Sequence, residues 1–280
     1  MAYTTLEDFF GDIVGKARRG QGISEEALGR DTGLSARQIG QIESYALTPD
    51  DDSIRALAKS LNLDGEKLVG VAHGWVPPQG NDVFEDQNIR VERLILDAGM
   101  TVNCYLLKCK ASGQGGVIDP GGQAQTILDA IAQFDLSVTH ILLTHGHGDH
   151  VGALDEIANA TEALVCGCER DFGLMGGRSQ KVAERVDEGW KTTIGKLSID
   201  TVSLPGHTGG GIGYYTESVF FSGDALFAGS LGGAKGEAYG GQIQAVFAKV
   251  LSLPGDTTVF PGHGPITSVG QELEHNPYFV

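Results

Sequence analysis

The sequence predicts a layered α/β domain preceded by a small all-helical domain. Residues 1–75 carry apolar positions at helical spacing, whereas short β-rich runs and helical stretches alternate from residue 88 onward. The intervening stretch, Val76-Pro77-Pro78-Gln79-Gly80-Asn81-Asp82, has a composition that resists both helix and sheet. We therefore expect a helical domain over residues 1–75, a linker over 76–87 and the α/β domain over 88–280.

The overall composition is ordinary for a globular protein. Among 280 residues, 41% are hydrophobic, and no apolar run approaches the roughly 20 residues that span a bilayer. The start lacks a basic region followed by an apolar core, so we expect no signal peptide and a cytoplasmic location. The four cysteines are too few for a disulfide scaffold and are expected to be free thiols on or beside strands. A net charge of -16 argues against a large nucleic-acid surface, because phosphate binding needs a concentrated positive face.

Four short amphipathic helices are predicted within residues 1–75. The apolar face of the first consists of Leu6, Phe9, Phe10, Ile13 and Val14. The second covers residues 25–31, and the third runs from a capping box at Ser35 and Gln38 to about Glu43. The fourth follows Thr48-Pro49-Asp50-Asp51, with Pro49 in its first turn. Its apolar face consists of Ile54, Leu57, Ala58 and Leu61.

The order of these helices, and the run from Ile42-Glu43 through Pro49 to Leu61, resemble the helix-turn-helix of the Cro and cI repressor class. The resemblance covers about 60 residues and implies that the third helix reads the DNA major groove, with Arg37 and Gln38 as contacts. It also suggests a homodimer. The sequence departs from the pattern at Ser44-Tyr45-Ala46-Leu47, where a small or basic turn is usual. Residues 1–75 hold 8 Lys and Arg against 12 Asp and Glu, so a helical module for dimerisation or docking is an equal alternative to DNA binding.

After the linker, strands are expected at residues 89–96, 100–107 and 116–118. The third strand ends in the sharp turn Asp119-Pro120-Gly121-Gly122. A helix over residues 123–134 and a buried strand over 139–143 follow. This order of strands, helix and strand indicates a mixed α/β layered fold.

The stretch Thr144-His145-Gly146-His147-Gly148-Asp149-His150 follows that buried strand directly. It gathers three of the eight histidines of the chain within six residues, together with a carboxylate. Imidazole and carboxylate are ligands that zinc, iron and manganese prefer, and a loop at the carboxyl end of a strand is where α/β proteins place chemistry. We expect His145 and His147 to converge on one ion, and Asp149 and His150 to face a second.

Two half-coordinated metals need further ligands downstream, and the sequence supplies three candidates. His207 lies in Leu204-Pro205-Gly206-His207, after a predicted strand over residues 197–202. Asp224 ends the apolar run that begins at Val219, and His263 follows Thr258-Val259-Phe260-Pro261-Gly262. Because each candidate lies at the end of a β-run, we expect one edge of a sheet to collect all seven side chains.

The complete set, His-x-His-x-Asp-His with the later Gly-His-Thr, Gly-Asp and Gly-His, resembles the metallo-β-lactamase fold superfamily. The resemblance covers about residues 88–280 and implies an αββα sandwich with the active site along one edge. It assigns His145, His147 and His207 to the first metal, and Asp149, His150 and His263 to the second. Asp224 would bridge both metals, and Asp119 would support the ligands from behind.

The chemistry that this likeness implies is hydrolysis of an acyl bond by metal-bound hydroxide. Two divalent ions roughly 3.5 to 4 Å apart can share a hydroxide formed near neutral pH. Asp149 or Asp224 would orient it or accept its proton. Zinc is the expected metal, and iron or manganese suits the same ligands.

Within the superfamily, the runs around His207, Asp224 and His263 look like type II glyoxalases, which hydrolyse the thioester S-lactoylglutathione. The ending Asn276-Pro277-Tyr278-Phe279 resembles the short bacterial form, and only 17 residues follow His263, so we expect the helical glutathione-binding domain of longer enzymes to be absent. Where those enzymes carry an arginine and an Asp-Phe, this chain has a glycine-rich run in which Lys235 and Tyr239 are candidate substrate contacts.

Three other functions stay open from the sequence. One is a persulfide dioxygenase with a single iron at the first three histidines, and another is a lactonase. The third is a DNA-binding regulator whose metallo domain senses a ligand without turnover.

Overall fold

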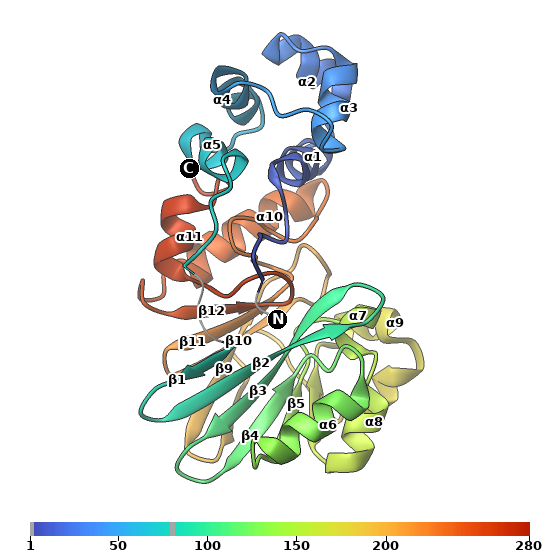
Figure 1. The fold of residues 1–280 in the computed structure, drawn as a ribbon. Helices are drawn as coiled ribbons and strands as arrows, with labels where there is room; N and C mark the ends of the chain where they lie inside the picture. The colour runs from blue at the N-terminus through green and yellow to red at the C-terminus, as the bar shows by residue number, and fades with distance from the viewer. Residues whose placement is uncertain (1–2, 79–81) are drawn as a thin grey trace.

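The computed structural model describes residues 3–78 and 82–280. A helical domain is stacked on a sandwich whose layers are helices, sheet, sheet and helices (Figure 1). The predicted αββα fold class, with a small helical domain in front, is thereby confirmed. Within the described residues, no helix combines the length and apolar character needed to cross a membrane.

Five helices form the first domain. They are α1 (Phe10–Gly20), α2 (Glu25–Thr32), α3 (Ala36–Glu43), α4 (Asp51–Ser60) and α5 (Gly65–Ala72). The capping box at the start of α3 is confirmed, since Ser35 Oγ accepts from the Gln38 amide while Gln38 Oε1 accepts from the Ser35 amide. The apolar face predicted for α4 is likewise buried.

Three details of this domain differ from the prediction. Phe9 precedes α1 and is 49% exposed, because the helix begins one residue later and rotates Phe9 away from the core. Pro49 lies outside α4, whose N-cap is Asp50 with its carboxylate accepting from the Ser53 amide. The fifth helix was not predicted; Asp64 caps it, and its short apolar pattern lies close to the linker.

The first sheet has seven strands in the order β1-β2-β3-β4-β5-β6-β7. Their bounds are Val83–Glu85, Ile89–Asp97, Thr101–Cys109, Gln114–Ile118, Ser137–Leu142, Leu164–Gly167 and Glu184–Arg185. Strands β1 to β4 pair antiparallel, whereas β4 to β7 pair parallel. Strand β1 falls inside the stretch expected to be a linker, so the sheet begins before residue 88; residues 79–81 of that stretch lie outside the described residues.

The second sheet has six strands in the order β13-β12-β11-β10-β9-β8. In chain order, β8 to β13 span Lys191–Ile194, Leu197–Ser203, Ile212–Thr216, Val219–Gly223, Thr258–Pro261 and Thr267–Ser268. Among the described strands of this second sheet, only β11 and β12 pair parallel. The predicted strand ends that precede Asp224 and His263 therefore point the same way and lie side by side.

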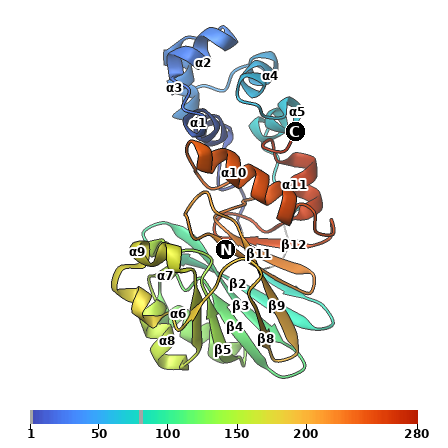
Figure 2. The ribbon, with the colours of Figure 1, turned by 180° about the vertical axis from the view of Figure 1, so that it is seen from behind.

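Six further helices cover the sandwich. They are α6 (Ala124–Gln133), α7 (Gly148–Val151), α8 (Leu154–Thr161), α9 (Phe172–Met175), α10 (Glu237–Ala245) and α11 (Val269–His275). Gly152-Ala153 separate α7 from α8. The first four lie on the side of the first sheet, and α10 and α11 lie between the second sheet and the helical domain (Figure 1, Figure 2).

Three apolar cores hold these layers together, and successive side chains along one strand contribute to different cores. Along β11, Val219 and Phe221 point into the core between the sheets, whereas Phe220 points to the opposite face. That opposite face shares one continuous core with α10, α11 and the helices of the first domain. Ile13 of α1 and Tyr278, which follows α11, both belong to this core. The helical domain is therefore packed onto the sandwich rather than tethered to it.

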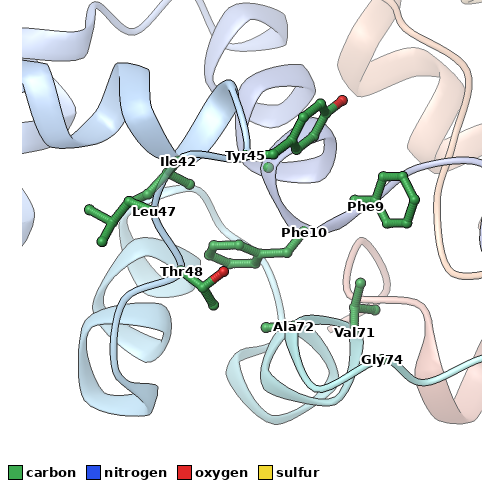
Figure 3. A pocket seen from close by; sticks show the side chains of 10 residues that line it. Phe9, Phe10, Ile42, Tyr45, Leu47, Thr48, Val71, Ala72 and Gly74 are labelled. Atoms are coloured by element: carbon green, nitrogen blue, oxygen red, sulfur yellow. The ribbon is translucent and has the colours of Figure 1, made fainter.

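A cavity of about 430 Å³ lies within the helical domain (Figure 3). It is lined by Phe9, Phe10, Gly11, Ile42, Tyr45, Leu47, Thr48, Val71, Ala72 and Gly74. These residues carry no ionisable acid, base or imidazole other than the Tyr45 phenol, so this cavity offers none of the candidate metal ligands.

Candidate metal centre

The predicted metal loop lies where β5 meets α7. The strand ends at Leu142, and His147 is the N-cap of α7, which places Asp149 and His150 on its first turn. Such a tight reversal brings His145 and His147 next to the helix start, with ring centroids 4.8 Å apart. His150 is fully buried, and His145 is nearly so.

The remaining three candidates come from the second sheet. His207 follows β9, Asp224 follows β11 and His263 follows β12. The prediction that one sheet edge collects all seven side chains is wrong in this respect, because the edges of both sheets contribute. Gly262 permits the approach, since a Cβ there would lie 2.1 Å from Asp224 Oδ1 and 2.7 Å from His150 Cε1.

Three imidazole nitrogens converge in a first group. His147 Nδ1 lies 3.1 Å from His145 Nε2 and 3.0 Å from His207 Nε2. The outer nitrogens of the two flanking rings face oxygen acceptors: His145 Nδ1 is 3.1 Å from Thr144 Oγ1, and His207 Nδ1 is 3.1 Å from Gly233 O. Because the outer Nδ1 atoms donate, the Nε2 atoms of His145 and His207 each carry a lone pair. A single proton on His147 Nδ1 can form a hydrogen bond with only one of these two nitrogens.

A second group consists of Asp149, His150 and His263. His263 Nδ1 donates to Thr101 O at 2.6 Å and His150 Nδ1 donates to Asp119 Oδ2 at 2.9 Å, so their Nε2 atoms face each other at 3.3 Å. Asp149 Oδ2 lies 3.3 Å from His263 Nε2 and 3.5 Å from His150 Nε2. Two lone pairs at this distance repel unless a proton or a cation lies between them.

Asp224 lies between the two groups. Its Oδ2 is 3.4 Å from His207 Nε2 and 3.4 Å from His263 Nε2, one nitrogen from each group. Its Oδ1 is 3.3 Å from His150 Nε2 but receives no hydrogen bond from the described residues. A buried carboxylate oxygen without a donor is costly, and a cation removes that cost.

The pKa values of the histidines also indicate that the second group favours positive charge. Burial would lower the pKa of His150, but the carboxylates of Asp224 and Asp119 raise it to about 10. Burial likewise opposes protonation of His263, yet hydrogen bonds to Asp149 and Asp224 raise its pKa to about 11. Burial and the neighbouring His150 hold the pKa of His145 well below its usual value. His145 is thus a neutral imidazole, whereas the second group attracts a cation.

Together these contacts fit a dinuclear metal site. Within each group, His145-His147-His207 and Asp149-His150-His263, one potential ligand atom per residue lies within 4.8 Å of the others. Neutral imidazole and carboxylate donors suit zinc, iron and manganese alike, so the donor set leaves the metal open.

Asp119, predicted to support the candidate ligands, contacts His150 and the backbone just before His145. Its backbone has φ 52°, and its carboxylate accepts from the Thr144 amide at 2.8 Å, Thr144 Oγ1 at 2.6 Å and His150 Nδ1. Such partners fix the tautomer and orientation of a ligating imidazole.

Asp171 belongs to the candidate site, although the sequence did not predict it. Its fully buried carboxylate accepts from the Gly146 amide at 3.0 Å and the Gly210 amide at 2.7 Å. It thereby joins the loop of His145 and His147 to the loop of His207. No motif marks this residue, because its partners are backbone amides distant in sequence.

A cavity of about 250 Å³ opens onto the candidate ligands. It is lined by Glu7, Asp8, Lys16, Met100, His147, Asp149, His207, Asp224, Phe227, Gly232, Gly233 and His263. Neither Lys235 nor Tyr239, the expected substrate contacts, belongs to this lining. Tyr239 packs on Gly20 of α1 and beside Tyr278, and Tyr214 is buried with its hydroxyl donating to Leu143 O.

Two family models match the chain. The model described as metallo-beta-lactamase superfamily covers residues 98–263, which include all seven candidate ligands, and a helix-turn-helix model covers residues 14–68. The chain belongs to the metallo-beta-lactamase superfamily. With its histidine and aspartate clusters, it is a metallo-hydrolase of that superfamily carrying a helix-turn-helix domain.

Several members of the superfamily resemble the chain. It is 31% identical over 196 residues to the hydroxyacylglutathione hydrolase GloC of Haemophilus influenzae, covering 63% of this chain and 92% of that protein. It is 34% identical over 182 residues to the probable metallo-hydrolase YqgX of Bacillus subtilis, covering 58% and 85%. The crystal structure of TTHA1623 in a di-iron-bound form superposes with a TM-score of 0.56 and 31% identity, over 67% of this chain and 99% of that one.

Proposed function

We propose that this superfamily member is a dinuclear metal-dependent hydrolase that cleaves a thioester or related acyl bond. The observation that carries the proposal is the position of Asp224, with one oxygen 3.4 Å from a histidine of each group. A site for a single ion at the first three histidines would not require that oxygen to face His263 as well. Likeness to a hydroxyacylglutathione hydrolase supports the thioester class.

Two bound divalent ions would supply a hydroxide nucleophile near neutral pH and polarise the acyl carbonyl. The seven proposed ligands are His145, His147, Asp149, His150, His207, Asp224 and His263. Asp149 and Asp224 are the carboxylates suited to orient the nucleophile or accept its proton, because both line the cavity. Burial opposes ionisation of Asp149, but the hydrogen bond with His263 holds its pKa below the usual value, so it is a carboxylate at neutral pH.

The test is hydrolysis of S-lactoylglutathione by the full chain, with bound metals counted on the same sample. We expect turnover with two metals per chain, and Asp224→Ala or His147→Ala should lose metal and activity together. Turnover retained in either variant contradicts the assigned roles. Two metals without turnover would remove this substrate and direct the search to other thioesters and lactones. One iron per chain with oxygen consumption would instead favour the persulfide dioxygenase.

DNA binding by the helix-turn-helix domain is a second proposed activity, favoured by the family match over residues 14–68. Arg37 on α3 is exposed, whereas Gln38 is partly occupied by the cap at Ser35. The Glu43 carboxylate pairs with Arg18 at 2.5 Å and with Arg19 at 2.8 Å. These ion pairs neutralise part of the positive charge of the domain, which argues against a broad basic surface. Duplex DNA titrated with the full chain at low and high salt tests this activity, and Arg37→Ala should weaken binding. No binding at low salt contradicts it.

A further inference from the structure

The helical domain reaches into the cavity of the metal centre. The segment that leads into α1, together with α1 itself, contributes Glu7, Asp8 and Lys16 to the lining. Figure 1 shows this N-terminal segment running from the sandwich up to α1. The GloC and YqgX matches cover 92% and 85% of those proteins, which leaves at most 15% of either for a counterpart of this domain.

Asp8 and Lys16 attach this domain to the loop after Asp224. The buried Asp8 Oδ2 accepts from Lys16 Nζ at 2.5 Å and from Ser230 Oγ at 2.5 Å. Lys16 Nζ also donates to Leu231 O at 3.0 Å, and it lies 5.2 Å from the centroid of the Phe227 ring. Two residues of the first domain thus hold two successive residues of the loop.

That loop in turn contacts two of the proposed ligands. Gly233 O is 3.1 Å from His207 Nδ1, the outer nitrogen whose proton leaves Nε2 free to bind metal. A Cβ at Gly232 would lie 1.9 Å from Asp224 O and 3.1 Å from His207 Cγ, so the loop backbone packs directly against both. Displacement of residues 230–233 would therefore remove the partner that sets the His207 ring.

We propose that Asp8 and Lys16 are positioning residues of the metal centre. They hold residues 230–233 so that Gly233 O orients the His207 imidazole, and with Glu7 they form one wall of the substrate cavity. This inference rests on the proposed function, because it assigns residues to the same site. It makes the helix-turn-helix domain part of the hydrolase rather than a separate module.

The experiment compares the full chain with Lys16→Met, Lys16→Arg and Lys67→Met. The last is a matched control, because Lys67 on α5 ties the same two domains through Leu273 O at 2.8 Å and Phe279 O at 2.6 Å, and it does not line the cavity. Metal affinity is measured by competition with a chelator, and the visible spectrum of the Co²⁺-loaded chain reports ligand geometry. Neither readout needs turnover, so absence of thioester hydrolysis in the unaltered chain would reject only the proposed substrate.

Lys16→Met should weaken binding of the Co²⁺ ion held with His207 about 10-fold or more and change the spectrum, as loss of an outer partner does. Lys16→Arg should restore both, since a guanidinium can donate to Asp8 and Leu231 together. Lys67→Met should lower the melting temperature without changing either readout. Unchanged affinity and spectrum in Lys16→Met, or an equal change in Lys67→Met, would overturn the proposal. If Lys16→Met does not fold, Ser230→Ala removes the loop-side donor to Asp8 and should shift the same spectrum in the same direction.

Discussion

Replacing Asp119 with asparagine should weaken metal binding while leaving the chain folded. Asn keeps the size of the side chain and one carbonyl oxygen, which can still accept from the Thr144 amide. Its NH₂ group then faces His150 Nδ1, which the carboxylate oxygen now meets at 2.9 Å. Two N–H donors cannot share that contact, so asparagine disfavours the neutral tautomer of His150 that carries its proton on Nδ1.

The magnitude follows from where Nε2 points. That atom lies 3.3 Å from Asp224 Oδ1 and 3.5 Å from Asp149 Oδ2, inside the proposed second metal group. To bind a metal through Nε2, His150 must keep its remaining proton on Nδ1, which is the tautomer that asparagine disfavours. Losing such an outer partner typically costs about 10- to 100-fold in metal affinity, or about 1.4 to 2.7 kcal/mol.

The assay is competition of Zn²⁺ between a chromophoric chelator and the metal-free chain, with the melting temperature recorded on each variant. Glu272→Gln is the control, because Glu272 is also a fully buried carboxylate, accepting from Thr267 Oγ1 at 2.7 Å and Asn276 Nδ2 at 2.8 Å, yet it contacts none of the proposed ligands. We expect it to lose stability and keep metal affinity. Two ions bound with unaltered affinity by folded Asp119→Asn would refute the reasoning, and equal weakening in both variants would show only general destabilisation.

Three further predictions concern the cavity, the shared core and pH. Glu7→Gln should lower KM for the anionic S-lactoylglutathione about 2- to 5-fold with kcat unchanged, because it removes a carboxylate that repels the carboxylates of the substrate. Steady-state kinetics at two salt concentrations measure this change in KM, and a raised KM would contradict the prediction. Ile13→Ala should lower the free energy of unfolding by about 2 to 5 kcal/mol and move a single cooperative unfolding transition to lower temperature, since Ile13 is fully buried in the core that both domains share. Calorimetry that resolves two unfolding transitions would argue against a shared cooperative unit. Burial raises the pKa of Glu272 from 4.5 to about 7, so the folded state holds a proton that the unfolded chain has lost. The resulting stabilisation, about 3 kcal/mol, is complete below pH 4.5 and is lost as the pH rises through 7. Urea unfolding of the metal-saturated chain should therefore give a lower free energy of unfolding at pH 8 than at pH 5, and Glu272→Gln should not show this difference.

Much of the candidate metal centre could be predicted, because its residues follow local patterns in the sequence. One short loop holds His145, His147, Asp149 and His150. Glycines beside the other three candidates indicate turns at strand ends, at His207, Asp224 and His263. Asp171 was not predictable, because an aspartate whose partners are the amides of Gly146 and Gly210 carries no local pattern. Lys235 and Tyr239, which the sequence offered as substrate contacts, do not belong to the lining of the cavity, and a glycine-rich loop leaves the direction of its side chains undetermined.

By itself, the sequence determined the helix-turn-helix order, the strand ends and the candidate ligands, because hydrophobic periodicity and ligand chemistry are properties of neighbouring residues. Only the tertiary structure decided that the two domains share one core, and that Glu7, Asp8 and Lys16 line the cavity of the metal centre. Lys16 and Leu231 are 215 positions apart. Contacts across such separations depend on how apolar faces pack together, and no local pattern records which faces will meet.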